Sequence, residues 1–96
     1  MSVYVDRCQA AHVAGAPRAK SWCHMIADTP DELHAMASSI GLRREWFQAA
    51  PPASFPHYDL TATRRKEAVK LGAVECDRST FVAYMRRIRE ESRRAT

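Results

Sequence analysis

The sequence lacks the features that would place the protein in a membrane or mark it for export. No apolar run reaches the length of about 18 residues that a transmembrane helix needs. The N-terminus, Met-Ser-Val-Tyr-Val-Asp, has no basic region followed by an apolar stretch, which argues against a secretory signal. We therefore expect a cytoplasmic protein without a membrane partner.

Cysteine is scarce, and the chain has no Cys-x-x-Cys pair. The three cysteines are Cys8, Cys23 and Cys76, and this odd number at wide spacing argues against a secreted disulfide framework and favours reduced thiols. Cys23 and Cys76 lie in apolar contexts and are expected in the core. Cys8 is the more accessible thiol, but nothing near it in the sequence would activate it as a nucleophile.

The chain is short, with 96 residues and a net charge of +4. Because that length supports one modest core, we expect a single α/β domain over residues 1–90 and a frayed tail at residues 91–96. The positive charge permits binding to nucleic acid or another phosphate-containing partner. Most of the basic residues lie in the second half, at Arg64, Arg65, Lys66, Lys70, Arg86, Arg87, Arg89, Arg93 and Arg94.

Two short apolar runs predict strands at residues 2–6 and 21–27. The second run carries apolar groups on both alternating faces, which indicates a central strand. Between them, residues 7–20 are rich in Ala and are interrupted by Gly15 and Pro17, so we expect a long loop there.

Helix signals are clearest after the second strand. Thr29 and Glu32 fit a capping box, and Gly41 supplies the left-handed residue that ends the helix. Thr61 predicts the N-cap of a second helix that ends before Gly72.

A third helix is expected to begin after Asp77 or Ser79, with Phe81, Met85 and Ile88 forming its apolar stripe. Its last turns are rich in arginine, which suits the negative C-terminal end of a helix.

The segments between these helices are less regular. Residues 42–48 are predicted to be a strand or an extended segment that Trp46 and Phe47 anchor to the core. Three prolines make residues 49–56 a loop or polyproline stretch, and residues 73–76 resemble a brief strand. The element order favours a small single-domain α/β sandwich, a short mixed sheet of three to four strands packed with about three helices.

Histidines and aspartates stand at the ends of these elements, where rigid scaffolds often present chemistry. On a strand, His57 and Asp59 would point the same way. Together with Asp6 and His24 they could bind one divalent ion, because imidazole and carboxylate suit Zn²⁺, Mn²⁺ or Fe²⁺, and carboxylate suits Mg²⁺. His24, His57 and Asp59 are the candidate catalytic groups, and Asp6, His24, His57 and Asp59 are the candidate ligands.

A phosphate-containing substrate is the favoured target of such a site. Arg64 and Arg65 follow the N-cap of the second helix and could hold a phosphate by bidentate hydrogen bonds. Without a metal, His57 could serve as an acid or base, since its ordinary pKa lies near neutrality. A nucleotide base could stack on Trp22, Trp46 or Tyr58.

Structural roles are the alternative for the same residues. Asp6 and Asp28 would cap turns, His24 would be a hydrogen-bonded core residue, and residues 57–59 would start a helix. For the arginines, the simpler interpretation is likewise that they lie on the solvated face of a surface helix.

A different function would use the C-terminal helix. Arg86, Arg89 and Arg93 recur on one side of it and could contact a nucleic acid or a host protein. The rival hypothesis is therefore a non-enzymatic regulator or inhibitor that docks through this basic stripe. The oligomeric state does not follow from the sequence.

Several motifs occur together in this chain. They are Tyr4-Val5-Asp6, Trp22-x-His24-x-x-Ala27-Asp28, Glu32-Leu33-His34, Ile40-Gly41-Leu42, Trp46-Phe47-Gln48, His57-Tyr58-Asp59-Leu60-Thr61 and Leu71-Gly72-Ala73. Over roughly residues 2–76 the combination resembles a small bacterial and phage family known only as a domain of unknown function. The resemblance implies no activity, the segment at residues 7–20 departs from it, and the arginine-rich C-terminal helix lies outside it.

Overall fold

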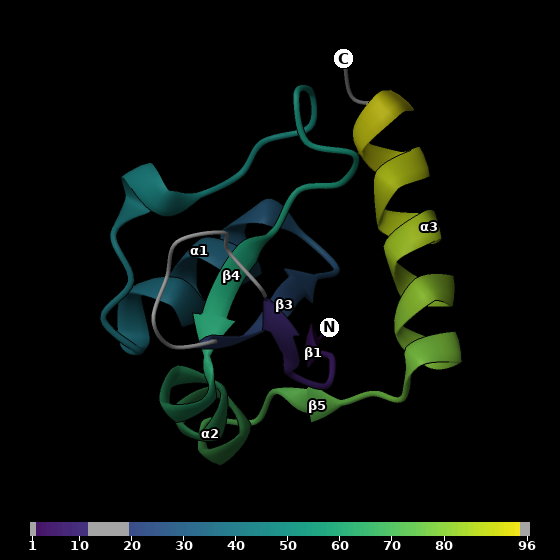
Figure 1. The fold of residues 1–96 in the computed structure, drawn as a ribbon. Coiled ribbons are helices and arrows are strands. Elements are labelled where there is room, and N and C mark those ends of the chain that lie inside the picture. Colours follow the sequence, from purple (N-terminus) through teal and green to yellow (C-terminus); the bar gives the residue numbers. More distant parts are fainter. Residues whose placement is uncertain (1, 12–19, 95–96) are drawn as a thin grey trace.

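The computed structural model describes residues 2–11 and 20–94, with residues 9–11, 20 and 21 described by their backbone only. The chain contains both strands and helices, mixed along the sequence as predicted for an α/β protein (Figure 1). The strands are β1 (Val3–Val5), β2 (Gln9–Ala11), β3 (Lys20–Ala27), β4 (Tyr58–Thr61) and β5 (Val74–Glu75). The helices are α1 (Pro30–Ser39), the 3₁₀ turn η1 (Arg44–Trp46), α2 (Ala62–Lys70) and α3 (Arg78–Arg94).

The strands form a mixed sheet around β3. Both β1 and β2 pair antiparallel with successive parts of one edge of β3, and β4 pairs antiparallel with its other edge. On the far side of β1, β5 pairs in parallel. The five strands thus occupy four positions across the sheet, and the predicted small α/β fold with a mixed sheet and three helices is confirmed.

The first face of the sheet carries the larger core. Side chains alternate along β3, so Cys23, Met25 and Ala27 share one face and are buried there. They pack with Leu60 of β4 and with apolar residues of α1 and α2. The helical members of this cluster are Leu33, Ala37, Ile40 and Ala68.

The second face is covered in part by α3. Ile26 of β3 and Tyr4 of β1 pack against Phe81 and Ile88, two members of the predicted apolar stripe. The ring of Tyr84 stacks on Tyr4 with a centroid distance of 4.3 Å. Figure 1 shows α3 along the right of the sheet, with β4 on the other side of β3.

The rest of the second face belongs to β3 and β4. His24 is the register partner of Asp59, and Trp22 is the partner of Thr61. Asp59 is 39% exposed and Trp22 is 38% exposed, and of α3 the Phe81 ring reaches to 6.3 Å from the His24 ring. This partly exposed end of the face therefore carries a histidine and a carboxylate side by side.

The predicted helix ends are confirmed. The Thr29 side chain accepts a hydrogen bond from the Glu32 backbone N–H as the N-cap of α1, and its hydroxyl donates to the Glu32 carboxylate. Thr61 caps α2 in the same way. For α3 the cap is Asp77, whose Oδ1 accepts from the Thr80 backbone N–H at 2.8 Å.

Residues 42–48 do not form the expected strand or extended segment. Residues 44–46 form the turn η1, and Gln48 alone forms a β-bridge, with His57. A single bridge leaves too few ladder hydrogen bonds for a strand. The bridge nevertheless places Gln48 beside the start of β4.

The two aromatic residues of this segment have different environments. Phe47 packs against the core of the first face, as expected. The expectation that Trp46 is a core anchor is wrong, because its side chain is 51% exposed. It lies in η1, which turns it away from the core, and the Arg43 guanidinium lies 5.9 Å from its ring centroid.

The segment predicted as a long loop contains β2, and its residues 12–19 lie outside the described part of the chain. Cys8 and Cys23 form a disulfide, so the expectation that both are reduced thiols is wrong. The antiparallel path of β1 and β2 along β3 brings them together across 15 residues of sequence. Cys76 is free and buried, as predicted, and burial raises the pKa of its thiol.

At the C-terminal end, α3 continues through Arg94, so residues 91–94 are helical where a frayed tail was expected. Among the helices of the described residues, none is long and apolar enough to cross a membrane.

Candidate metal centre

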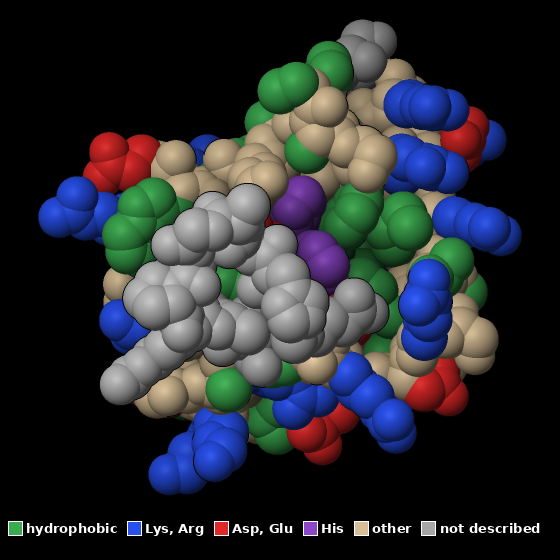
Figure 2. Space-filling view, in the orientation of Figure 1, with side chains coloured by type: hydrophobic (Ala, Val, Ile, Leu, Met, Phe, Trp, Pro, Cys, Tyr) green, Lys and Arg blue, Asp and Glu red, His purple; other side chains and the backbone are tan. Residues whose placement is uncertain are grey.

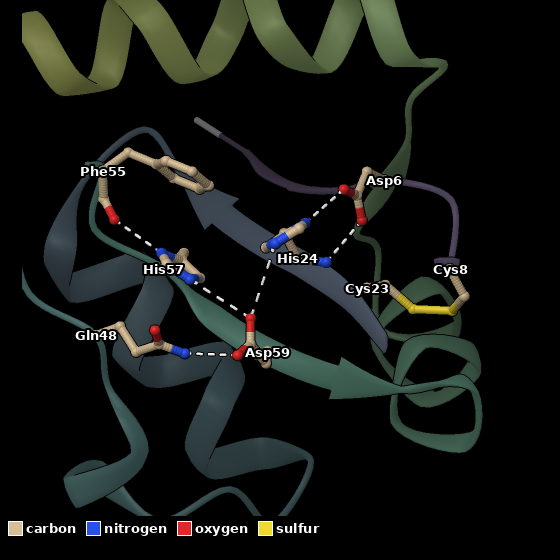
Figure 3. Close-up of polar contacts among 8 residues, drawn as sticks. All are labelled: Asp6, Cys8, Cys23, His24, Gln48, Phe55, His57 and Asp59. Carbon is tan, nitrogen blue, oxygen red and sulfur yellow. Dashed lines mark hydrogen bonds and ion pairs between the residues drawn. A yellow bond between two sulfur atoms is a disulfide. The ribbon is translucent and has the colours of Figure 1, made fainter. Parts of the chain in front are cut away.

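Three potential ligands meet at this partly exposed end of the second face. They are His24, His57 and Asp59, and their ligand atoms all lie within 4.8 Å of one another. Nε2 of His57 lies 3.4 Å from Asp59 Oδ1, and Nε2 of His24 lies 3.9 Å from the same oxygen (Figure 3). The register of β3 and β4 sets the position of His24 opposite Asp59, and His57 precedes Asp59 by two residues on the same face.

The orientation of His24 is set by Asp6. His24 Nδ1 lies 2.7 Å from Asp6 Oδ2, and the His24 backbone N–H donates to Asp6 Oδ1 at 2.6 Å. The hydrogen bond to Asp6 raises the pKa of His24, against the opposing effect of burial. Because a carboxylate accepts hydrogen bonds, Nδ1 carries a proton, and in the neutral form of the ring Nε2 is the acceptor that faces Asp59.

The orientation of His57 is set by the backbone. Its Nδ1 donates to the carbonyl oxygen of Phe55 at 2.8 Å, and a carbonyl can only accept. The Phe55 ring stacks on the imidazole with a centroid distance of 4.4 Å, and His57 itself is buried. Its Nε2 is therefore also a fixed acceptor that faces Asp59.

Asp59 is held by a residue that the sequence did not single out. Gln48 Nε2 donates to Asp59 Oδ2 at 2.6 Å, which leaves Oδ1 facing the two imidazoles. The bridge between Gln48 and His57 makes this contact possible. No local sequence pattern predicts the contact between Gln48 and Asp59, because the two residues belong to separate segments.

Two imidazoles and one carboxylate form a donor set that suits Zn²⁺, Fe²⁺ or Mn²⁺. Metal-binding histidines typically donate their second N–H to a carboxylate or backbone carbonyl, and both arrangements occur here. Three protein ligands on one side leave coordination positions open for water or substrate. Figure 2 shows His side chains reaching the surface on this face of the molecule.

Asp6, the fourth candidate ligand, and Asp28 lie outside this group of three. Asp6 stands behind His24, and both of its carboxylate oxygens contact that histidine. Asp28 accepts hydrogen bonds from the Ser2 backbone N–H and the Tyr4 hydroxyl, and it forms an ion pair with Arg87. It therefore ties β1 to α3 and is not part of the centre.

The structural alternative in which residues 57–59 start a helix is wrong. Tyr58 and Asp59 belong to β4, and α2 begins only after Thr61, the last residue of that strand.

The two arginines proposed to hold phosphate have different surroundings. Arg65 Nε donates to the backbone carbonyl of Asp6 at 2.7 Å, and its Nη1 lies 2.8 Å from Glu75 Oε1. Arg64 donates to the backbone carbonyl of Ile40 and lies beside a cavity that Asp59 also lines. Arg64 is therefore the arginine placed next to the centre, and Arg65 braces the chain around Asp6.

Replacing Arg65 with Met should lower the free energy of unfolding by about 1–3 kcal/mol, since the Asp6 carbonyl would lose its partner in a partly buried site. Urea denaturation measures the effect. Lys66→Met, at an exposed position of the same helix, should change stability by less than about 0.5 kcal/mol. Unchanged stability in Arg65→Met together with lost phosphate binding would instead support the direct phosphate role.

The basic stripe of the C-terminal helix lies apart from the three ligands. Arg86 is exposed, and Arg89 and Arg93 line a cavity formed with Ala50, Pro51, Ala53 and Ser54. Figure 2 shows Lys and Arg side chains gathered along the right side of the molecule, where α3 runs.

Two cavities adjoin the centre. One, of about 510 Å³, is lined by His24 and by the cationic Arg7 and Arg78. The other, of about 480 Å³, is lined by Asp59 and Arg64. Both volumes lie in the range of small-molecule sites, and each places a cation near a candidate ligand.

A family model described as "Protein of unknown function (DUF4031)" matches residues 3–88. The match reaches into α3, so the C-terminal helix lies partly inside the resemblance instead of wholly outside it. No curated protein and no solved structure matches the chain.

Proposed function

The chain belongs to the DUF4031 family of proteins of unknown function, and we propose that it is a metal-dependent hydrolase of phosphate-containing substrates. His24, His57 and Asp59 hold one divalent ion, and the substrate is a nucleotide or a nucleic acid. The observation that carries this proposal is the arrangement of the free acceptors. Each imidazole has its Nδ1 occupied, by Asp6 or by the Phe55 carbonyl, and presents Nε2 to the same carboxylate oxygen.

This arrangement is costly unless the three groups share a proton or a metal ion. Two imidazole lone pairs and a carboxylate oxygen all accept, so in the absence of a shared proton or cation they repel one another. Gln48 donates a hydrogen bond to Asp59, and the two imidazoles donate to Asp6 and to the Phe55 carbonyl. These hydrogen bonds keep the rings and the carboxylate from turning away from one another. A divalent cation satisfies all three acceptors at once.

The chemistry follows from the ion and the nearby cations. A bound ion of this type polarises a phosphoryl oxygen and lowers the pKa of a bound water. In the proposed reaction the water oxygen bonds to phosphorus, the P–O ester bond breaks, and a proton from the water ends on the leaving oxygen. Arg7 and Arg78 beside His24, and Arg64 beside Asp59, are placed to offset the negative charge of the substrate.

A chromogenic assay tests the hydrolase proposal. Chelator-stripped protein is reloaded with Zn²⁺, Mn²⁺, Fe²⁺ or Mg²⁺ and given p-nitrophenyl phosphate or bis(p-nitrophenyl) phosphate. We expect metal-dependent release of p-nitrophenol that Asp59→Asn and His57→Ala abolish and that Asp31→Asn, an exposed change on α1, preserves. Release that persists in both centre variants, or no release by the loaded parent on either ester, would contradict the proposal.

The carboxylate behind His24 should tune metal affinity. Asp6→Asn keeps the size of the side chain but replaces one acceptor oxygen with an NH₂ group, so it cannot accept from both His24 N–H groups. We expect metal affinity to fall about 10–100-fold, the usual effect of losing such a partner. Competition with a chromogenic chelator measures it, with Asp31→Asn as the matched control. Equal affinity in Asp6→Asn and the parent would mean that Asp6 does not orient the ligand.

A second candidate function is docking on a nucleic acid or host protein through α3. The observation in its favour is the concentration of cations along that helix, which includes Arg86, Arg89 and Arg93 (Figure 2). Changing these three to serine should spare metal-dependent hydrolysis and abolish partner binding, whereas His57→Ala should do the reverse.

A further inference from the structure

Both tryptophans of the chain are exposed. The sequence has two, and their side chains are 38% exposed at Trp22 and 51% exposed at Trp46. Within the described residues, no other ring stacks on either indole, and the one ring contact of Trp46 is the Arg43 guanidinium. Exposed indole faces leave a large apolar area in water, which proteins tend to avoid unless the area binds something.

The two indoles line the same cavity, and that cavity reaches the proposed metal centre. Its volume is about 480 Å³, and Leu42, Asp59 and Arg64 also line it. The sequence does not predict that the two side chains share a cavity, because they belong to separate elements, Trp22 to β3 and Trp46 to η1.

The sheet fixes the distance between this cavity and the centre. Trp22 precedes His24 by two residues, so both side chains lie on the second face of β3. Their register partners on β4 are Thr61 and Asp59, in that order. A group bound against Trp22 therefore lies next to the neighbouring pair on this face, His24 and Asp59, which are two of the proposed ligands.

Arg64 supplies a positive charge on the wall of the cavity. Its guanidinium lies against Gly41, where an added Cβ would come within 2.7 Å of Nη1. Gly41 has a φ of +79°, a conformation that glycine adopts without strain. The end of α1 thereby leaves room for the arginine, which donates to the Ile40 carbonyl and pairs with Glu67.

We propose that this cavity binds the base of a nucleoside phosphate, with the planar ring stacked on Trp22 and Trp46 and the phosphate directed toward Arg64 and Asp59. Indole faces bind any nucleobase, because every base has a π-face, and a cation beside them recognises the phosphate. The inference rests on the proposed hydrolase function in one respect, since the ion at the centre is what would act on that phosphate. Stacking itself does not require the ion.

Intrinsic fluorescence tests the inference, because the two indoles are the chain's tryptophan reporters. Zn²⁺-loaded protein is titrated with adenosine 5′-monophosphate, with ribose 5-phosphate, and with a short single-stranded oligonucleotide. The variants Trp22→Phe and Trp46→Phe each retain one indole. We expect the mononucleotide to quench the tryptophan fluorescence of both variants, and ribose 5-phosphate to quench the fluorescence of neither. Tighter binding of the oligonucleotide than of the mononucleotide would place the base at a nucleic-acid end, and the reverse would indicate a free nucleotide. Both outcomes support stacking.

Affinity measurements by calorimetry give the second readout. Trp22→Leu and Trp46→Leu should each weaken mononucleotide binding about tenfold and leave Zn²⁺ affinity unchanged. Leu71→Ala, an exposed apolar residue away from this cavity, is the matched control. Equal mononucleotide affinity in the parent and both leucine variants, or equal quenching by ribose 5-phosphate, would overturn the inference.

A repeat of the titration in chelator separates the two proposals. Mononucleotide quenching that persists in chelator would support the stacking site without the ion, and only a parent protein that also fails to bind Zn²⁺ in a direct titration would refute the metal centre. Zn²⁺ binding without any nucleotide quenching would support the metal centre and refute the stacking site.

Discussion

Saturating Zn²⁺ should raise the melting temperature of the chelator-stripped protein by about 10–20 °C, and His57→Ala should remove that increase. A ligand at about one hundred times its Kd stabilises the folded state by about 2.7 kcal/mol. In a domain of about 100 residues, each kcal/mol moves the melting temperature by about 4–8 °C. Thermal unfolding followed by circular dichroism, with and without the ion, measures the difference.

His57 is the most informative ligand to remove because its ring is buried and its Nδ1 is already bonded to the Phe55 carbonyl. Its loss could also disturb the loop before β4, so Asp59→Asn provides a variant of almost unchanged shape. Asp31→Asn should retain the full Zn²⁺ response. A response in Asp59→Asn and His57→Ala equal to that of the parent would show that the ion binds elsewhere.

Leu60→Ala should lower the free energy of unfolding by about 2–5 kcal/mol. The Leu60 side chain is 0% exposed and packs in the core between the sheet and the helices α1 and α2. Because small domains are stable by only about 5–15 kcal/mol, this one truncation removes a large share. Urea denaturation at low temperature measures it, and a loss below about 1 kcal/mol would contradict the packing described.

The same variant separates stability from binding. Leu60 lies between Asp59 and Thr61 on β4, and alternation places its side chain on the opposite face from the centre. The protein that remains folded should therefore bind Zn²⁺ with the affinity of the parent. A large fall in the affinity of folded Leu60→Ala would show that the two faces are coupled.

The sequence predicts the local features of this fold well. The caps at Thr29 and Thr61, the terminating Gly41 and the central position of β3 depend on residues that are close together in the chain. The alternation that sets His57 and Asp59 on one face is also local, and it holds once residues 58–61 form a strand.

Contacts between distant segments could not be predicted in the same way. The pairing of His24 with Asp59 depends on the register of β3 and β4, which no residue near either one reveals. The Gln48 contact and the Cys8–Cys23 disulfide depend on similar long-range pairing.

Trp46 shows a different limit. Its aromatic character predicts burial, but its position in η1 directs it to solvent, and the proposed nucleotide cavity would give a reason for that exposure.

Metal binding by the two imidazoles can be observed directly in a long-range ¹H–¹⁵N correlation spectrum of their nitrogens during titration with Zn²⁺. We expect the Nε2 resonances of His24 and His57 to move to metal-bound positions at one ion per chain, while both Nδ1 atoms keep their protons. Binding through Nδ1, binding at other histidines, or no change in these two rings would contradict the proposed metal centre.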